Sequence, residues 1–81
     1  FQASYRHLDV NKLNKMTKNE LEIMRNEIFA RYGLKFSLGG EMDLYFRQQK
    51  WYKPQYENVT KFLTQLELGN IELIKEIENS K

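Results

Sequence analysis

Two capping boxes constrain the fold of this chain more than any other feature, because each one defines where a helix begins. The first is Thr17-Lys18-Asn19-Glu20, and the second is Thr64-Gln65-Leu66-Glu67. In each box the threonine hydroxyl accepts a hydrogen bond from the glutamate amide, and the glutamate carboxylate accepts one from the threonine amide. The boxes predict helices over residues 18–32 and 65–78.

The apolar residues that follow each box recur with the helical period of about 3.6 residues. They are Leu21, Met24, Ile28, Phe29 and Tyr32 in the first helix, and Leu66, Leu73, Ile74 and Ile77 in the second. Gly33 follows the first of these helices and supplies the left-handed residue that commonly ends a helix. Each helix is therefore expected to bury one face.

Two shorter helices are predicted over residues 9–16 and 41–50. Asp9 can cap the first of them, and Pro54 disfavours helix in the segment that follows the second. Val10, Leu13 and Met16 form an apolar edge in the first, and the second is defined by the helical spacing of Met42, Tyr45, Phe46 and Gln49. No segment has the pattern of a strand, so the expected fold class is all-α, a compact orthogonal bundle of about four helices.

The composition fits a single folded domain over residues 1–81. Hydrophobic residues make up 41% of the chain, the formal net charge is only +2, and the absence of cysteine excludes disulfides and cysteine-based zinc sites. The longest apolar runs are three residues, far short of the roughly 20 needed to span a membrane. Because the chain begins at Phe1 rather than Met, we expect a processed product or a fragment of a longer protein.

Two polar residues, Arg25 and Asn70, fall within the apolar helical faces. Buried polar groups require partners, which could be loop carbonyls, a carboxylate such as Asp43 or Glu27, or each other. Both residues are interpreted as a structural polar core, although Arg25 has a functional alternative as a clamp for an acidic ligand. The carboxylates of the last helix are expected to form a solvated face and are Glu67, Glu72, Glu76 and Glu78.

Catalytic and metal-binding chemistry are not expected. The single histidine, His7, has only Ser4 and Asp9 nearby in the sequence, and three residues in one loose segment do not make a catalytic triad. Two potential metal ligands without others at a recognisable spacing do not make a metal site. The sequence thus predicts no enzyme, no metal and no cofactor.

The segment 45–56 combines five aromatic and three basic residues with no acidic one. Such a segment could bind nucleic acid, but the low net charge of the chain and the absence of a further basic stripe disfavour this interpretation. Trp51 is interpreted as a core anchor, whereas the exposed residues could contact a peptide or a sugar. The candidate ligand contacts are Arg47, Lys50, Tyr52, Lys53 and Tyr56.

The run from Arg25 to Gly33, with Tyr45-Phe46, Trp51-Tyr52 and Asn70-Ile71 after it, resembles the YARHG domain of bacterial proteins. The name-giving run reads Phe29-Ala30-Arg31-Tyr32-Gly33 here, so Tyr32 stands where the family has histidine and no role of that imidazole carries over. Arg31 does match, and its position suits a structural role, either a salt bridge to Glu27 one turn earlier or a contact to the loop after Gly33.

The resemblance implies an extracytoplasmic location, in a bacterial lipoprotein or a secreted or membrane-anchored protein, and no established activity. The expected function is a non-catalytic binding module for a protein or glycan of the cell envelope. The alternative is a structural accessory or spacer domain of a larger protein. An exposed aromatic cluster or groove would favour binding, and buried rings would favour the structural interpretation.

Overall fold

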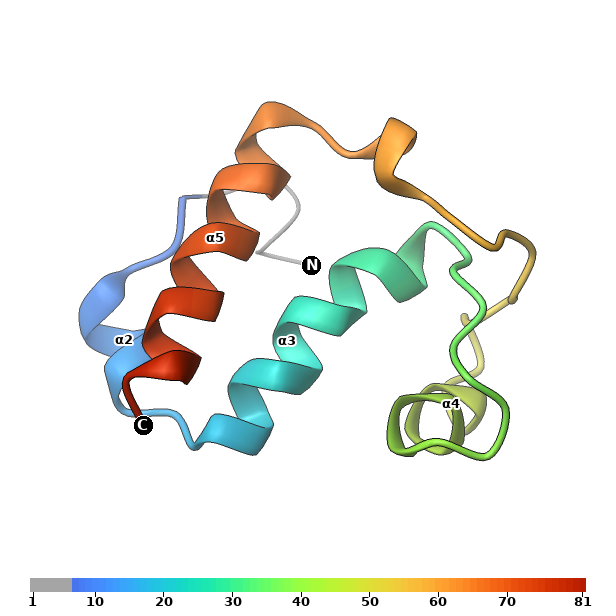
Figure 1. The fold of residues 1–81 in the computed structure, drawn as a ribbon, viewed down its shortest axis with the longest axis horizontal. Coiled ribbons are helices and arrows are strands. Elements are labelled where there is room, and N and C mark those ends of the chain that lie inside the picture. The colour runs from blue at the N-terminus through green and yellow to red at the C-terminus, as the bar shows by residue number, and fades with distance from the viewer. Residues whose placement is uncertain (1–6) are drawn as a thin grey trace.

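The computed structural model describes residues 7–81 and shows a helical protein (Figure 1). Its elements are α2 (Val10–Asn14), α3 (Lys18–Arg31), α4 (Glu41–Arg47), a short 3-10 helix η1 (Thr60–Phe62) and α5 (Gln65–Asn79). Within residues 7–81 no strand forms, and the only bridge joins Leu34 to Tyr56. The all-α prediction is confirmed, and the segment expected as a loop before α5 contains η1.

Both capping boxes are formed. The amide of Thr17 donates to Glu20 Oε1 over 2.8 Å, and the Glu20 amide donates to Thr17 Oγ1 over 3.1 Å. At α5 the corresponding bonds between Thr64 and Glu67 are 2.9 and 3.1 Å long. The amide of Thr17 lowers the pKa of the Glu20 carboxyl because the bond favours the ionised form. These local signals place both long helices within one residue of their predicted bounds.

Gly33 ends α3 as the sequence predicts, with a φ of +90°. The Gly33 amide donates to Ala30 O over 2.9 Å, and the Leu34 amide donates to Phe29 O over 3.2 Å. This pair of bonds is a Schellman motif, which satisfies carbonyls that the helix itself leaves open. The chain then leaves α3 as the extended segment 34–36, which forms part of the candidate site.

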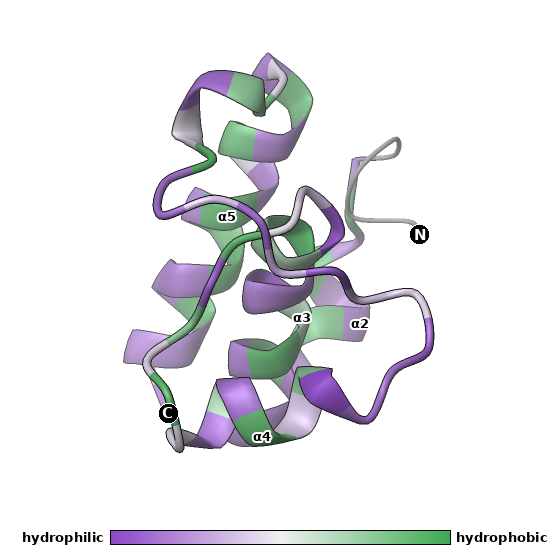
Figure 2. Cartoon of the chain, turned by 90° about the vertical axis from the view of Figure 1, so that its right-hand side faces the viewer, coloured by the Kyte–Doolittle hydropathy of each residue, from purple (hydrophilic) through white to green (hydrophobic). Residues whose placement is uncertain are grey.

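The main core lies between α3 and α5, which run side by side in Figure 1, with α2 packed against α5. One set of buried side chains comes from all three helices and comprises Leu13, Leu21, Ile74 and Ile77. Ile28 and Ile71 continue this core toward the end of α3. In Figure 2 each labelled helix carries both hydrophobic and hydrophilic residues, as expected for helices that bury one face.

A second cluster joins α4 to the last turns of α3. Its buried members are Ala30, Phe46 and Tyr52, and the Phe36 ring stacks on the Phe46 ring at a centroid distance of 5.2 Å. Figure 1 shows α4 nearly end-on at the far side of α3 from α5. The helix predicted over 41–50 is therefore too long: it ends at Arg47, because the chain must turn at 48–50 to bring Tyr52 back onto Phe46.

Two carboxylates of the last helix are not solvated, contrary to the sequence-based expectation. Glu67 is 1% exposed and Glu78 is 7% exposed. Glu67 Oε1 accepts hydrogen bonds from the Tyr32 hydroxyl and the Thr64 amide, and Glu78 pairs with Arg25. Each buried carboxylate is thus matched by donors from elsewhere in the fold, which a pattern within α5 alone does not reveal.

Candidate functional site

A groove of about 400 Å³ lies between α4, the segment that follows α3 and the segment that precedes η1. Polar and apolar side chains both line it. The lining residues are Lys35, Phe36, Ser37, Leu38, Asp43, Arg47, Tyr52, Pro54 and Glu57. Three segments that are apart in the sequence thus meet at one surface depression beside α4.

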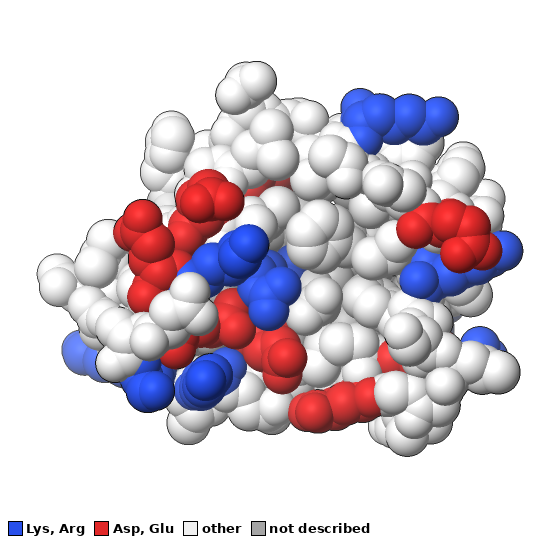
Figure 3. Space-filling view, in the orientation of Figure 1, with Lys and Arg blue, Asp and Glu red and all other residues white. Residues whose placement is uncertain are grey.

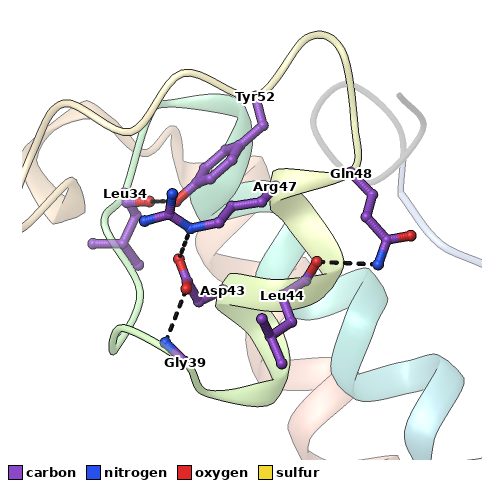
Figure 4. Close-up of polar contacts among 7 residues, drawn as sticks. All are labelled: Leu34, Gly39, Asp43, Leu44, Arg47, Gln48 and Tyr52. Carbon is purple, nitrogen blue, oxygen red and sulfur yellow. Dashed lines mark hydrogen bonds and ion pairs between the residues drawn. The ribbon is translucent and has the colours of Figure 1, made fainter.

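Asp43 anchors the polar side of this groove. It stands three residues after Gly40, the N-cap of α4, and is only 3% exposed. Its Oδ2 accepts a hydrogen bond of 2.9 Å from the Gly39 amide, and its Oδ1 accepts one of 2.7 Å from Arg47 Nε (Figure 4). The Gly39 amide, followed by Arg47, holds the pKa of Asp43 below its ordinary value, so the side chain is a carboxylate.

Arg47 lies one helical turn after Asp43, at the end of α4, and its side chain is 53% exposed. Within the part of the chain that the structure describes, its guanidinium bonds through Nε alone. In Figure 4 the two terminal nitrogens lie beyond Nε, on the side away from Asp43. The guanidinium is consequently fixed along one edge while the other edge remains available to a ligand.

Tyr52 forms a wall of the groove but belongs to the core. It is 8% exposed, and its hydroxyl donates to Leu34 O over 2.5 Å. Burial is the main cause that raises its pKa above the ordinary tyrosine value. Its assignment as an exposed ligand contact is therefore corrected: the ring packs against Phe36 and Phe46, and its hydroxyl is hydrogen-bonded to the backbone.

The remaining wall carries a loose ion pair. Lys35 Nζ lies 3.6 Å from Glu57 Oε1, and both side chains are well exposed. Two basic residues, Lys35 and Arg47, thus face two acidic residues, Asp43 and Glu57, so the formal charge of the groove is zero. Such a site does not attract polyanions through its overall charge.

The other predicted contacts lie outside the lining of this groove. Lys50 and Lys53 are exposed, and Tyr56 is 41% exposed with its ring 5.1 Å from that of Phe62. Trp51 is half-buried beside Phe46, at a centroid distance of 6.0 Å. The structure therefore divides the aromatic-basic segment between core, groove and open surface, and brings only Arg47 and Tyr52 together.

Arg25, one of the residues predicted for the polar core, pairs with a carboxylate, as expected, but with Glu78 rather than Asp43 or Glu27. Arg25 forms hydrogen bonds of 2.7 and 3.3 Å with the two oxygens of Glu78, which links α3 to α5. This pairing favours the structural interpretation of Arg25 because its guanidinium is already bound to a carboxylate of the same domain. Asn70 is 3% exposed, as its position on the apolar face predicts.

The salt bridge predicted between Arg31 and Glu27 is confirmed, with contacts of 3.1 and 2.9 Å. The Arg31 guanidinium also lies over the Trp51 ring, 3.9 Å from its centroid, in a cation–π arrangement. Arg31 thus ties the end of α3 to the turn after α4. This contact explains how a half-buried Trp51 can still anchor the second cluster.

Of the residues considered for catalysis, Ser4 lies outside the described residues, His7 is exposed, and Asp9 caps α2 through the Asn11 amide. No three His, Cys, Asp or Glu side chains within residues 7–81 come together as metal ligands. None of the helices in this range combines the length and the apolar character needed to cross a membrane. On the face drawn in Figure 3, basic and acidic side chains are interspersed.

Sequence reasoning missed most of the groove, including Lys35, Phe36, Ser37 and Glu57. One usable signal was present, because Asp43 and Arg47 stand four residues apart on a predicted helix, the spacing of a side-chain ion pair. The other residues lie in extended segments, where spacing along the chain does not reveal which side chains meet.

The YARHG domain family matches residues 1–79. The chain belongs to the YARHG domain family. No curated protein and no solved structure matched it. In this YARHG domain Tyr32 occupies the histidine position of the name-giving run. Its hydroxyl donates a hydrogen bond of 2.7 Å to Glu67 Oε1 and thereby links α3 to α5.

Proposed function

We propose that this YARHG domain is a non-catalytic binding module that recognises a component of the bacterial cell envelope, protein or glycan, at the groove beside α4. The observation that carries the proposal is the guanidinium of Arg47, which Asp43 holds along one edge and which is open along the other. The carboxylate that holds Arg47 is nearly buried, so it fixes the orientation of the guanidinium at the surface.

The dimensions and chemistry of the groove support this proposal. A volume of about 400 Å³ falls in the range of small-ligand sites. Phe36 and Pro54 offer apolar surface next to the polar groups of Arg47 and Lys35, a combination that suits a peptide or a sugar. The proposed extracytoplasmic location rests on what membership of the YARHG family implies.

A titration monitored by amide chemical shifts tests the proposal. Soluble peptidoglycan fragments should shift the amides of Gly39, Asp43 and Arg47, which surround the groove, and Arg47→Gln should weaken the effect. Lys75→Ala, an exposed position on α5, is the matched control and should bind as the wild type does. Shifts confined to the surface around Lys50 and Lys53 would contradict the assignment of the groove.

The second candidate function is a structural accessory domain, and the burial of aromatic rings favours it. Phe46 is fully buried and Tyr52 nearly so, which removes two of the rings that a stacking surface would need. Under this alternative, envelope fragments leave every amide of the groove unshifted. The domain should then raise the melting temperature of the segment to which it is joined in a longer chain.

A further inference from the structure

We propose that the group bound in this groove is a single carboxylate, held end-on by the two terminal nitrogens of Arg47. This inference rests on the proposed function and specifies its ligand. The carboxylate can come from the end of a peptide or from a sugar acid, since both present the same planar pair of oxygens.

The position of Arg47 supports end-on binding. Asp43 Oδ1 occupies the Nε of the guanidinium at 2.7 Å, so a ligand approaching along that edge would have to displace a nearly buried carboxylate. The edge formed by the two terminal nitrogens makes no hydrogen bond with the described residues. Two parallel N–H groups on a planar fork match the two oxygens of one carboxylate.

The arginine is also held in place before the ligand arrives. Asp43 is itself fixed by the Gly39 amide at 2.9 Å, at the turn that leads into α4. The two hydrogen bonds that connect Gly39 to Asp43 and Asp43 to Arg47 therefore orient the guanidinium before any ligand binds (Figure 4). A side chain that is already ordered loses less conformational freedom on binding, which favours affinity.

The charge of the groove selects a monoanion. The positive charges of Lys35 and Arg47 are balanced by the negative charges of Asp43 and Glu57. One negative charge on a ligand can pair with the open edge of Arg47, whereas a second negative charge on the same ligand would be repelled by the two carboxylates. A phosphate monoester carries nearly two charges at neutral pH and is disfavoured on this ground. A carboxylate carries one charge and has the planar shape of the fork.

The rest of the ligand would lie against the apolar lining. Phe36, Leu38 and Pro54 border the groove, and Leu38 is 85% exposed on the loop before α4. An apolar surface of this kind suits a small side chain or the face of a sugar ring next to the carboxylate. Free acetate, which lacks such a part, should therefore bind more weakly than an acylated peptide.

The experiment uses paired probes that differ only in the carboxylate. Amide shifts are followed while the protein is titrated with acetyl-alanyl-alanine, with its C-terminal amide, with methyl glucuronide and with methyl glucoside. The two acids should shift the amides of Gly39, Asp43 and Arg47. The neutral amide and the glucoside should bind with an affinity at least about tenfold lower, as loss of a charge-assisted hydrogen bond predicts. The relative strength of the two acids identifies the source of the carboxylate.

Variants separate the bidentate geometry from simple charge. Arg47→Lys keeps the positive charge but not the fork, so it should weaken both acids by about tenfold, with Arg47→Gln at least as weak. Asp43→Asn retains one acceptor for two donors and should give an intermediate loss, as expected of a positioning residue. Lys75→Ala should bind the acids as the wild type does, and a thermal melt verifies that each variant is folded.

The outcomes are distinguishable. Acids and neutral partners that bind equally at the groove would overturn the carboxylate assignment and leave the proposed binding function intact. Wild-type affinity of Arg47→Lys for the acids would overturn the end-on geometry. Stronger binding of inorganic phosphate than of either acid would overturn the preference for a monoanion. If no probe and no peptidoglycan fragment shifts the groove, both the inference and the proposed function are wrong.

Discussion

Tyr32 shows how one side chain can connect two helices through a capping interaction. Its hydroxyl donates to Glu67 Oε1, the oxygen that also accepts the Thr64 amide at the start of α5. The hydrogen bond to Glu67, followed by burial, raises the pKa of Tyr32 to about 12. Ionisation of this phenol is therefore coupled to the packing of α3 against α5.

This coupling predicts a dependence of stability on high pH. The pKa of Tyr32 is about 12 in the folded protein, whereas the ordinary value for tyrosine, taken for the unfolded chain, is 10.0. The contribution of the Tyr32 phenol to stability is therefore complete below pH 10 and is lost as pH rises toward 12. Urea unfolding at a series of pH values should show this loss in the wild type and a smaller one in Tyr32→Phe. At neutral pH that variant should lose about 1 to 3 kcal/mol. Identical pH profiles for the two proteins would show that the Tyr32 bond to Glu67 adds no stability.

Gly33 is required by its conformation and by its surroundings. With a φ of +90°, a Cβ at this position would lie 2.9 Å from the backbone oxygen of Lys53. Gly33→Ala should therefore destabilise the protein by more than the roughly 1 kcal/mol typical of a left-handed alanine. Gly39→Ala is the matched control, since its φ is +80° but nothing lies within 4 Å of the added carbon. Equal losses in chemical denaturation would show that the contact with Lys53 is unimportant.

At the scale of the element, the two capping boxes have the same sequence pattern and different surroundings. Thr17 and Glu20 are exposed, so their box acts on α3 alone. Glu67 is nearly fully buried and also receives Tyr32, so the second box is part of the contact between α3 and α5. A local motif is thereby incorporated into tertiary structure at one helix and not at the other.

The two threonines should consequently differ when they are replaced. Thr17→Ala is expected to cost about 1 kcal/mol, the usual value for loss of an N-cap side chain. Thr64→Ala should cost more, because the bond it removes helps to position a buried carboxylate that also binds Tyr32. Thermal unfolding of the two variants in parallel measures the difference. If Thr17→Ala is the more destabilising, the buried box has no special role.

At the scale of the whole molecule, two hydrophobic clusters meet at α3. The larger unites α2, α3 and α5, and the smaller holds α4 through Phe46 and Tyr52. α4 has only seven residues, a length at which an isolated helix is unstable in water. Its order therefore depends on the smaller cluster, and the candidate groove lies on this more weakly supported side.

Hydrogen exchange should reveal this division. Amides of α4, such as that of Phe46, are expected to exchange faster than those of Ile28 in α3 and Ile74 in α5, because local opening of α4 leaves the larger cluster intact. Phe46→Leu should accelerate exchange in α4 chiefly, whereas Ile74→Val should accelerate it throughout. Uniform protection across the three helices would indicate a single cooperative unit.

The sequence alone determined the helices and much of their faces. The capping boxes and Gly33 predict the ends of α3 and the start of α5 because these interactions involve neighbours within a few residues. The ion pair of Arg31 with Glu27 was predicted for the same reason. Family membership also followed from the residues themselves.

Only the tertiary structure decided which polar groups are buried and where the groove lies. Glu78 meets Arg25 across 53 residues, and Tyr32 meets Glu67 across 35. Helical periodicity cannot anticipate such pairs, because the relative rotation of two helices depends on packing over the whole core. The groove likewise exists because the turn after α4 returns Tyr52 to Phe46, which brings Arg47 beside the segment that follows Gly33.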